Sequence, residues 1–207
     1  MKINKPKVKN LIPKKINDCL EELEFCNSIF SGDEINSKLQ SIIIDSCIFE
    51  NISFNLAEIE NVDLVDVIFR NCDLSNQDFS KQLVNRVIFE NCKMVGTNFI
   101  ESSLKDVQFD NCDCRYVNFV DSKINNLIIK NSNFNEASFN ETKIKNIELD
   151  KVKFNKAEFF NTCLENVDFS SCDISEIRID KGSIKGIIID RFQAECIVQM
   201  FGIKIKF

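Results

Sequence analysis

The side chains of this sequence that could carry out chemistry are ten cysteines and 32 carboxylates, and there is no histidine. Without histidine, a cysteine or serine nucleophile lacks its usual base and a zinc site lacks a common ligand. The cysteines form no CxxC pair, and Cys112 and Cys114 are the only close pair. There is also no glycine-rich phosphate loop. These features predict a protein that is not an enzyme and that holds no metal or cofactor.

The cysteines also bear on the compartment. The N-terminus is rich in lysine and lacks the apolar stretch of a signal peptide, and every apolar run is too short to span a membrane. We therefore expect a cytoplasmic protein without membrane association, in which the thiols are free and serve as small core residues.

The carboxylates are unevenly distributed along the chain. Residues 1–17 contain six lysines and no acid, so the other 190 residues hold 20 bases against 32 acids, a balance of −12. Such an acidic body repels nucleic acid and attracts proteins that bind DNA, although the acidity could equally serve solubility alone. The basic segment 1–17 is interpreted as a mobile tail, with binding to a membrane or to nucleic acid as the alternative.

A repeat of five residues must position these side chains. From Leu39 to Ile189 every fifth residue is apolar, which gives 31 consecutive repeats, with Cys114 among the centres. A smaller residue, such as Val107 or Cys112, precedes many centres by two positions. A period of five fits neither a helix nor a plain strand. It predicts a chain that points two residues inward, turns a corner and repeats, with the repeats stacked on one another.

A second period of twenty residues gives the number of corners. Twenty residues are four repeats, so the expected coil is square and like residues stack on like residues, about 4.8 Å apart at strand spacing. We expect hydrogen bonds along the asparagine column and core packing of the cysteine and phenylalanine columns. The columns with this spacing are Asn51, Asn71, Asn91, Asn111 and Asn131; Ile48, Ile68, Ile88 and Ile128; Cys72, Cys92 and Cys112; and Phe79, Phe99, Phe119, Phe139 and Phe159.

One of the four expected faces is more acidic than the others. It is centred on the column from Phe79 to Phe159, and within it Glu101, Asp121 and Glu141 place one carboxylate on each successive coil. Stacked like charges destabilise a free rod, which suggests use by a partner, with ordinary solvated acidity as the alternative. The candidate partner-binding residues are Glu58, Glu60, Asp78, Glu101, Asp121, Glu141, Glu158 and Asp180.

The ends of the chain depart from this register. Leu20, Phe25, Phe30 and Ile35 continue the five-residue spacing, and a step of four to Leu39 indicates a local distortion. The repeats are therefore assigned to residues 18–189, which makes nearly nine coils. Residues 190–207 are expected to form a short helix with Asp190 as N-cap and Gly202 as its end, followed by a terminal strand IKIKF. The helix is expected to cap the coil and to form a homodimer, since an open solenoid end must be covered. The residues assigned to dimerisation are Phe192, Cys196, Ile197, Met200 and Phe201.

The five-residue pattern resembles the pentapeptide-repeat superfamily and covers most of the chain. Two segments, LVDVIFRNCDLSNQDF (64–79) and IKGIIIDRFQAECIVQMFGI (184–203), are most similar to Qnr-type quinolone-resistance and MfpA-like proteins. The resemblance implies an all-β fold, a right-handed quadrilateral parallel β-helix that dimerises through a short C-terminal α-helix. It also implies DNA mimicry towards DNA gyrase or topoisomerase IV, with protection against quinolones. Unlike several Qnr proteins, this chain has no inserted loop between Leu39 and Ile189.

Two functions therefore remain open. The first is a DNA-mimicking protein that binds gyrase or topoisomerase IV and modulates quinolone action, without binding nucleic acid itself. The alternative is a structural or scaffold module for an unrelated protein partner, because a fold does not fix a function.

Overall fold

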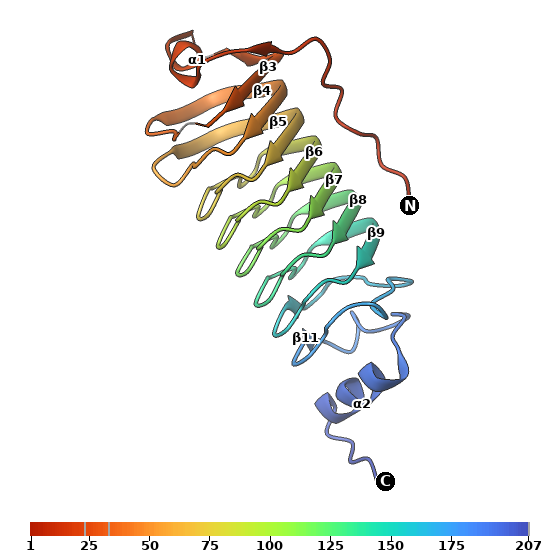
Figure 1. Ribbon diagram of the computed structural model, residues 1–207. Coiled ribbons are helices and arrows are strands. Elements are labelled where there is room, and N and C mark those ends of the chain that lie inside the picture. The colour runs from red at the N-terminus through yellow and green to blue at the C-terminus, as the bar shows by residue number, and fades with distance from the viewer. Residues whose placement is uncertain (23, 33, 207) are drawn as a thin grey trace.

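The computed structural model describes residues 1–22, 24–32 and 34–206 and shows a parallel β-solenoid of about eight turns with a short C-terminal helix (Figure 1). Seven strands stack one per coil along one side of the rod, and the chain between them crosses the remaining sides. The elements are β1 (Ile12–Pro13), α1 (Ile16–Glu22), β2 (Phe25–Cys26), β3 (Ser28–Ser31), β4 (Lys38–Glu50), β5 (Glu58–Arg70), β6 (Leu83–Glu90), β7 (Ser103–Asp110), β8 (Lys123–Lys130), β9 (Lys143–Asp150), β10 (Glu158–Phe159), β11 (Arg178–Ile179) and α2 (Arg191–Met200).

The strand register confirms a coil of twenty residues. In β5 and β6, Leu64 lies opposite Val84 and Phe69 opposite Phe89. The same spacing continues through single bridges on the other sides, down to Asp168 opposite Ile188. No loop interrupts the register from Leu39 to Ile188, as the sequence predicts.

The corners are made by a left-handed backbone at most of the positions spaced five residues apart from Ser41 to Gly186. The five asparagines from Asn51 to Asn131 have φ between +50° and +57°. Asparagine tolerates this region better than most residues because its short polar side chain bonds locally. Along the column, the Asn71 amide donates to the Asn51 side-chain oxygen at 3.0 Å and the Asn111 amide to that of Asn91 at 2.8 Å. The expected asparagine ladder is therefore present between these neighbours.

The interior is filled by two stacks of phenylalanine rings. In one stack the rings of Phe99 and Phe119 lie 5.1 Å apart and nearly parallel, and those of Phe119 and Phe139 lie 4.9 Å apart. The second stack meets the first edge-on, as between Phe109 and Phe119, whose planes cross at 83°. Stacked and edge-to-face pairs are both favourable arrangements of ring quadrupoles, so the two columns hold each other in place.

The structure corrects the expected start of the repeats. Leu20 is not a repeat centre, because it lies in α1, and the boundary expected at residue 18 falls inside this helix. Ile16 and Cys19 of α1 are buried against the core. The helix thus covers the first coil, whose open end would otherwise expose the ring of Phe25, and the rod has about eight turns instead of nearly nine. The step of four residues between Ile35 and Leu39 is confirmed, since Phe30 pairs with Phe49, nineteen positions later instead of twenty.

The C-terminal helix matches its prediction, whereas the strand after it does not. Asp190 caps α2 through a capping box with Gln193, and Gly202 has a φ of +76° at its end. Residues 203–206 form no strand, and Phe207 lies outside the described residues. The Ile203 N–H bonds to the carbonyl of Val198 at 3.3 Å, so it closes the helix end instead of pairing with a neighbouring strand.

The basic N-terminal segment is not a free tail in this structure. It runs from β1 back along the outside of the stack (Figure 1), and the Ile3 side chain is buried. The sequence predicts a mobile tail because it does not show the surface on which the segment lies. That surface is a column of isoleucines that points outward from the strands.

The ring stacks generate a stability prediction. Phe119→Ala should lower the free energy of unfolding by about 3–5 kcal/mol, because it removes a fully buried ring that packs against several others. Phe160→Ala is the matched control, since this ring is 38% exposed and its loss should cost less than about 1 kcal/mol. Urea unfolding followed by circular dichroism measures both, and equal losses would contradict the assignment of Phe119 to the shared core.

Candidate interaction surface

The structure places the eight predicted carboxylates on one side of the rod, here called the acidic face. Glu58 and Glu60 lie at the start of β5, Glu158 lies in β10, and Asp78 bridges to the next coil. All are exposed except Glu158 and Asp180, which are half-buried.

Four of these carboxylates are bound by the protein itself. Asp78 accepts hydrogen bonds from the backbone N–H and the hydroxyl of Ser80. Lys38 pairs with Glu60 at 2.6 Å, and Arg178 pairs with Glu158 at 2.7 Å. Asp180 accepts hydrogen bonds from the backbone N–H groups of Asn161 and Gly182 and from the hydroxyl of Ser183. These bonds, that of Ser183 first, hold the pKa of Asp180 below its ordinary value. Such carboxylates stabilise the coil and have little left to offer a partner.

A second group remains free. Glu101, Asp121 and Glu141 occupy equivalent corners with φ of +56°, +55° and +58°, and all three are exposed. Lys81 approaches Glu101 at 3.8 Å, and both side chains are exposed, so this pair is weak. Within the described part of the chain, the carboxylates of Asp121 and Glu141 make no ion pair. This set of three is here called the corner column.

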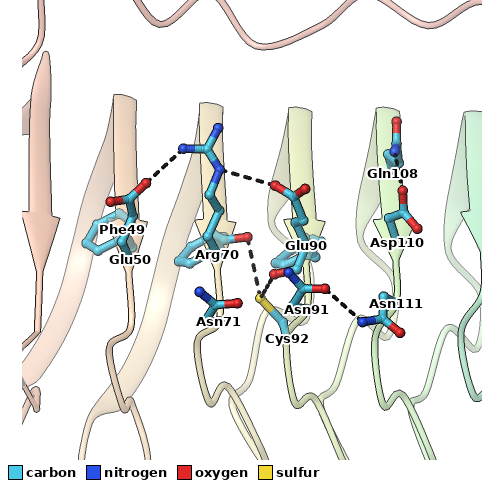
Figure 2. Close-up of polar contacts among 12 residues, drawn as sticks. Phe49, Glu50, Arg70, Asn71, Glu90, Asn91, Cys92, Gln108, Asp110 and Asn111 are labelled. Carbon is cyan, nitrogen blue, oxygen red and sulfur yellow. Dashed lines mark hydrogen bonds and ion pairs between the residues drawn. The ribbon is translucent and has the colours of Figure 1, made fainter.

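On the opposite side of the rod, charged side chains of neighbouring coils form ion pairs. There Arg70 donates to Glu50 at 2.8 Å and to Glu90 at 3.1 Å, so one guanidinium bridges the carboxylates of the two neighbouring coils (Figure 2). The pKa of Arg70 is raised, first by the hydrogen bond with Glu50. Glu50 and Glu90 on this side are therefore ion-paired within the described part of the rod, whereas Asp121 and Glu141 of the corner column are not.

The interior cysteines are packing residues, as expected. Cys72, Cys92 and Cys112 are buried one above another. The hydrogen bond with Cys112 and burial together raise the pKa of Cys92 to about 12, so this thiol does not ionise near neutral pH. Among the described residues, no three histidine, cysteine or acidic side chains are placed to hold a metal ion.

The residues predicted for dimerisation divide between two sides of α2. Ile197 is 8% exposed and packs against the last coil, so it belongs to the cap. Phe192 is 77% exposed, Met200 40% and Phe201 37%, and Cys196 is also exposed. Sequence reasoning did not include Ile203, which is 57% exposed just beyond the helix.

In the described part of the chain, neither helix is long and apolar enough to cross a membrane.

The chain is similar to several solved structures at low sequence identity. QnrB1, a plasmid-mediated fluoroquinolone resistance protein, is 17% identical over 84% of this chain and 97% of its own, with a TM-score of 0.42. HetL, a pentapeptide repeat protein involved in heterocyst differentiation regulation in the cyanobacterium Nostoc, is 14% identical over 85% and 97%, with a TM-score of 0.29. A pentapeptide repeat protein of the Arabidopsis thaliana thylakoid lumen is 19% identical over 48% and 66%, with a TM-score of 0.28.

Family models identify the repeat directly. The model of the pentapeptide repeat region matches residues 62–139, and the model of eight pentapeptide repeats matches residues 132–170. No curated protein matches the chain. The matched residues lie in the segment where the twenty-residue register is unbroken. The chain therefore belongs to the pentapeptide-repeat family.

Proposed function

We propose that this chain is a binding protein whose acidic face occupies the DNA-binding surface of DNA gyrase or topoisomerase IV and thereby modulates the action of quinolones. The observation that carries the proposal is the corner column, in which Glu101, Asp121 and Glu141 stay exposed and largely uncompensated.

The column has the charge pattern that a DNA-binding surface recognises. Such a surface is basic and attracts regularly spaced negative charge. In DNA, each strand carries one phosphate charge per about 3.4 Å of the helix axis. The corner column repeats once per coil, about 4.8 Å at strand spacing, which is of the same order. Because the rod fixes the carboxylates in place, ordering them on binding costs little.

The composition of the column does not serve stability. A left-handed φ costs an ordinary L-residue about 1–2 kcal/mol, and asparagine or glycine would reduce that cost. Glu101 and Glu141 have no such advantage, and their charges repel along the stack. The acidic residues at these corners are therefore better explained by a partner than by folding.

The choice of partner rests on the sequence. The segments 64–79 and 184–203 resemble those of Qnr-type proteins, and the second includes the helix α2, which covers the end of the rod. We further propose that two copies associate through the exposed apolar side of this helix, formed by Phe192, Cys196, Met200 and Phe201.

Replacing the corner column tests the binding face. The triple variant Glu101→Asn, Asp121→Asn, Glu141→Asn removes three charges and leaves residues that suit the left-handed corner, so the fold should be at least as stable. Three exposed ion pairs at roughly 0.5 kcal/mol each amount to about tenfold in affinity. We expect about tenfold more of the variant to be needed to alter gyrase supercoiling or to relieve quinolone inhibition.

The matched control removes three charges from the opposite side through Glu90→Gln, Asp110→Asn and Asp150→Asn, and should retain the effect of the original chain. If the original chain has no effect on gyrase or topoisomerase IV at tenfold excess, these partners are wrong. If the column variant acts as well as the original, the acidic face is wrong.

A single substitution tests the dimer. Phe201→Asp places a charge on the exposed apolar side of α2, where burial against a second copy would leave it unpaired, so the protein should become a monomer. Multi-angle light scattering measures the mass. Lys185→Asp, on an exposed residue of the last coil, should leave a dimer; a dimer that survives Phe201→Asp contradicts the proposed interface.

A further inference from the structure

A column of isoleucines on the outside of the rod is largely shielded from solvent. Three of its members are buried, whereas Ile88 is half-buried and Gln108 takes the next place in the column. Ile48, Ile68 and Ile128 each precede a face centre by one residue, so they point away from the core. Even so they are only 9%, 8% and 6% exposed. The column lies on the side opposite the acidic face, and something other than the coil covers it.

The chain's own N-terminal arm, here defined as residues 1–9, runs along this side of the rod (Figure 1) and lies against the column at Ile128. Met1 to Lys5 line one depression with Gln108 and Ile128, and Ile3 is 7% exposed. Its neighbours Lys2 and Lys5 are exposed, so the arm inserts an apolar side chain and leaves its lysines in solvent.

Polar contacts fix the arm along a row of corner residues beside the isoleucines. The Asn4 amide donates to Asp106 at 2.9 Å, and the Lys7 backbone N–H donates to Asp66 at 2.8 Å. Both aspartates are nearly inaccessible, at 1% and 5% exposed. The terminal amine of Met1 pairs with Glu148. Each aspartate is also held by the coil, Asp66 by Arg86 and Asp106 by Asn126, so the arm adds its donors to acceptors that the rod fixes in place.

The arm is bound as a ligand would be bound. Among the described residues, the backbone hydrogen bonds between the N-terminal part and the rod begin with Ile12, and residues 1–9 pair with no strand. One buried side chain and three polar contacts hold the arm, while β1 anchors the chain behind it. Such an attachment can open while the solenoid stays folded.

We propose that the depression at Ile128, here called the groove, is a binding site for an extended partner segment with an apolar residue between lysines, and that the arm occupies the groove in cis until such a segment displaces it. The chemistry of the partner follows from the arm: an apolar side chain against the isoleucine column, donors to Asp66 and Asp106, and positive charge towards Glu148. The proposal is independent of the acidic face and of topoisomerase binding.

A labelled peptide of the arm sequence, MKINKPKVK, tests the groove on full-length protein by fluorescence anisotropy. Ile3→Asp in the protein should release the arm, because a carboxylate cannot stay unpaired in the apolar column. Since the arm competes at the high effective concentration of a tethered segment, the variant should bind the peptide at least about tenfold more tightly than the original chain.

Two substitutions locate the binding. Adding Ile128→Lys to the Ile3→Asp protein should abolish peptide binding by placing a like charge in the groove, whereas Ser138→Lys, at the equivalent position of the acidic face, should not. A peptide carrying Ile3→Asp should not bind. Circular dichroism checks that each protein is folded.

Three results would overturn the proposal: equal binding of the peptide to the original and Ile3→Asp proteins, no binding to either, or binding that survives Ile128→Lys. A dimer of the original chain that Ile3→Asp dissolves would also overturn it, because the arm would then lie on a second copy.

Discussion

The fold depends on a corner that the backbone turns at nearly every fifth residue, with φ in the left-handed region. That turn is unfavourable for most residues, and one isolated repeat has no core to offset it. Stacking resolves the conflict, because each coil buries two inward side chains per repeat against the coils above and below. The parallel rings of Phe99, Phe119 and Phe139 show how this burial becomes continuous along the axis.

Once the inside is set by two positions in five, the outside is free to differ from face to face. Each coil contacts only its neighbours, so a change in one outward column has little effect on another. The Arg70 bridges compensate charge on one side, whereas Asp121 and Glu141 stay uncompensated on the other. The faces of one rod can therefore differ in charge while the coil that carries them keeps the same shape.

The sequence predicts the periodic part of the molecule almost completely, because the period is itself the local structure. Its ends could not be predicted in the same way. Leu20 keeps the five-residue spacing, yet it lies in a helix because the first coil needs a cover. The alternating IKIKF segment lacks a neighbouring strand edge, and its first N–H turns back to α2. The sequence groups the eight carboxylates on one face. It does not show that Arg178 binds Glu158 while the carboxylates of the corner column stay exposed; only the distances in the structure show this.

The isoleucine column can be identified from the sequence, but the N-terminal arm that lies on it cannot. The period of twenty identifies the isoleucines as equivalent, and their position one residue before each centre places them outside the core. An outward apolar column suggests a cover, since a large apolar patch exposed to water is unfavourable, although Gln108 interrupts this one. The column itself does not identify the covering segment. The segment before β1 is long enough to reach the column, and two buried aspartates accept hydrogen bonds from it. The exposed surface of this solenoid is therefore set partly by a segment outside the repeats, which lies on the side opposite the acidic face.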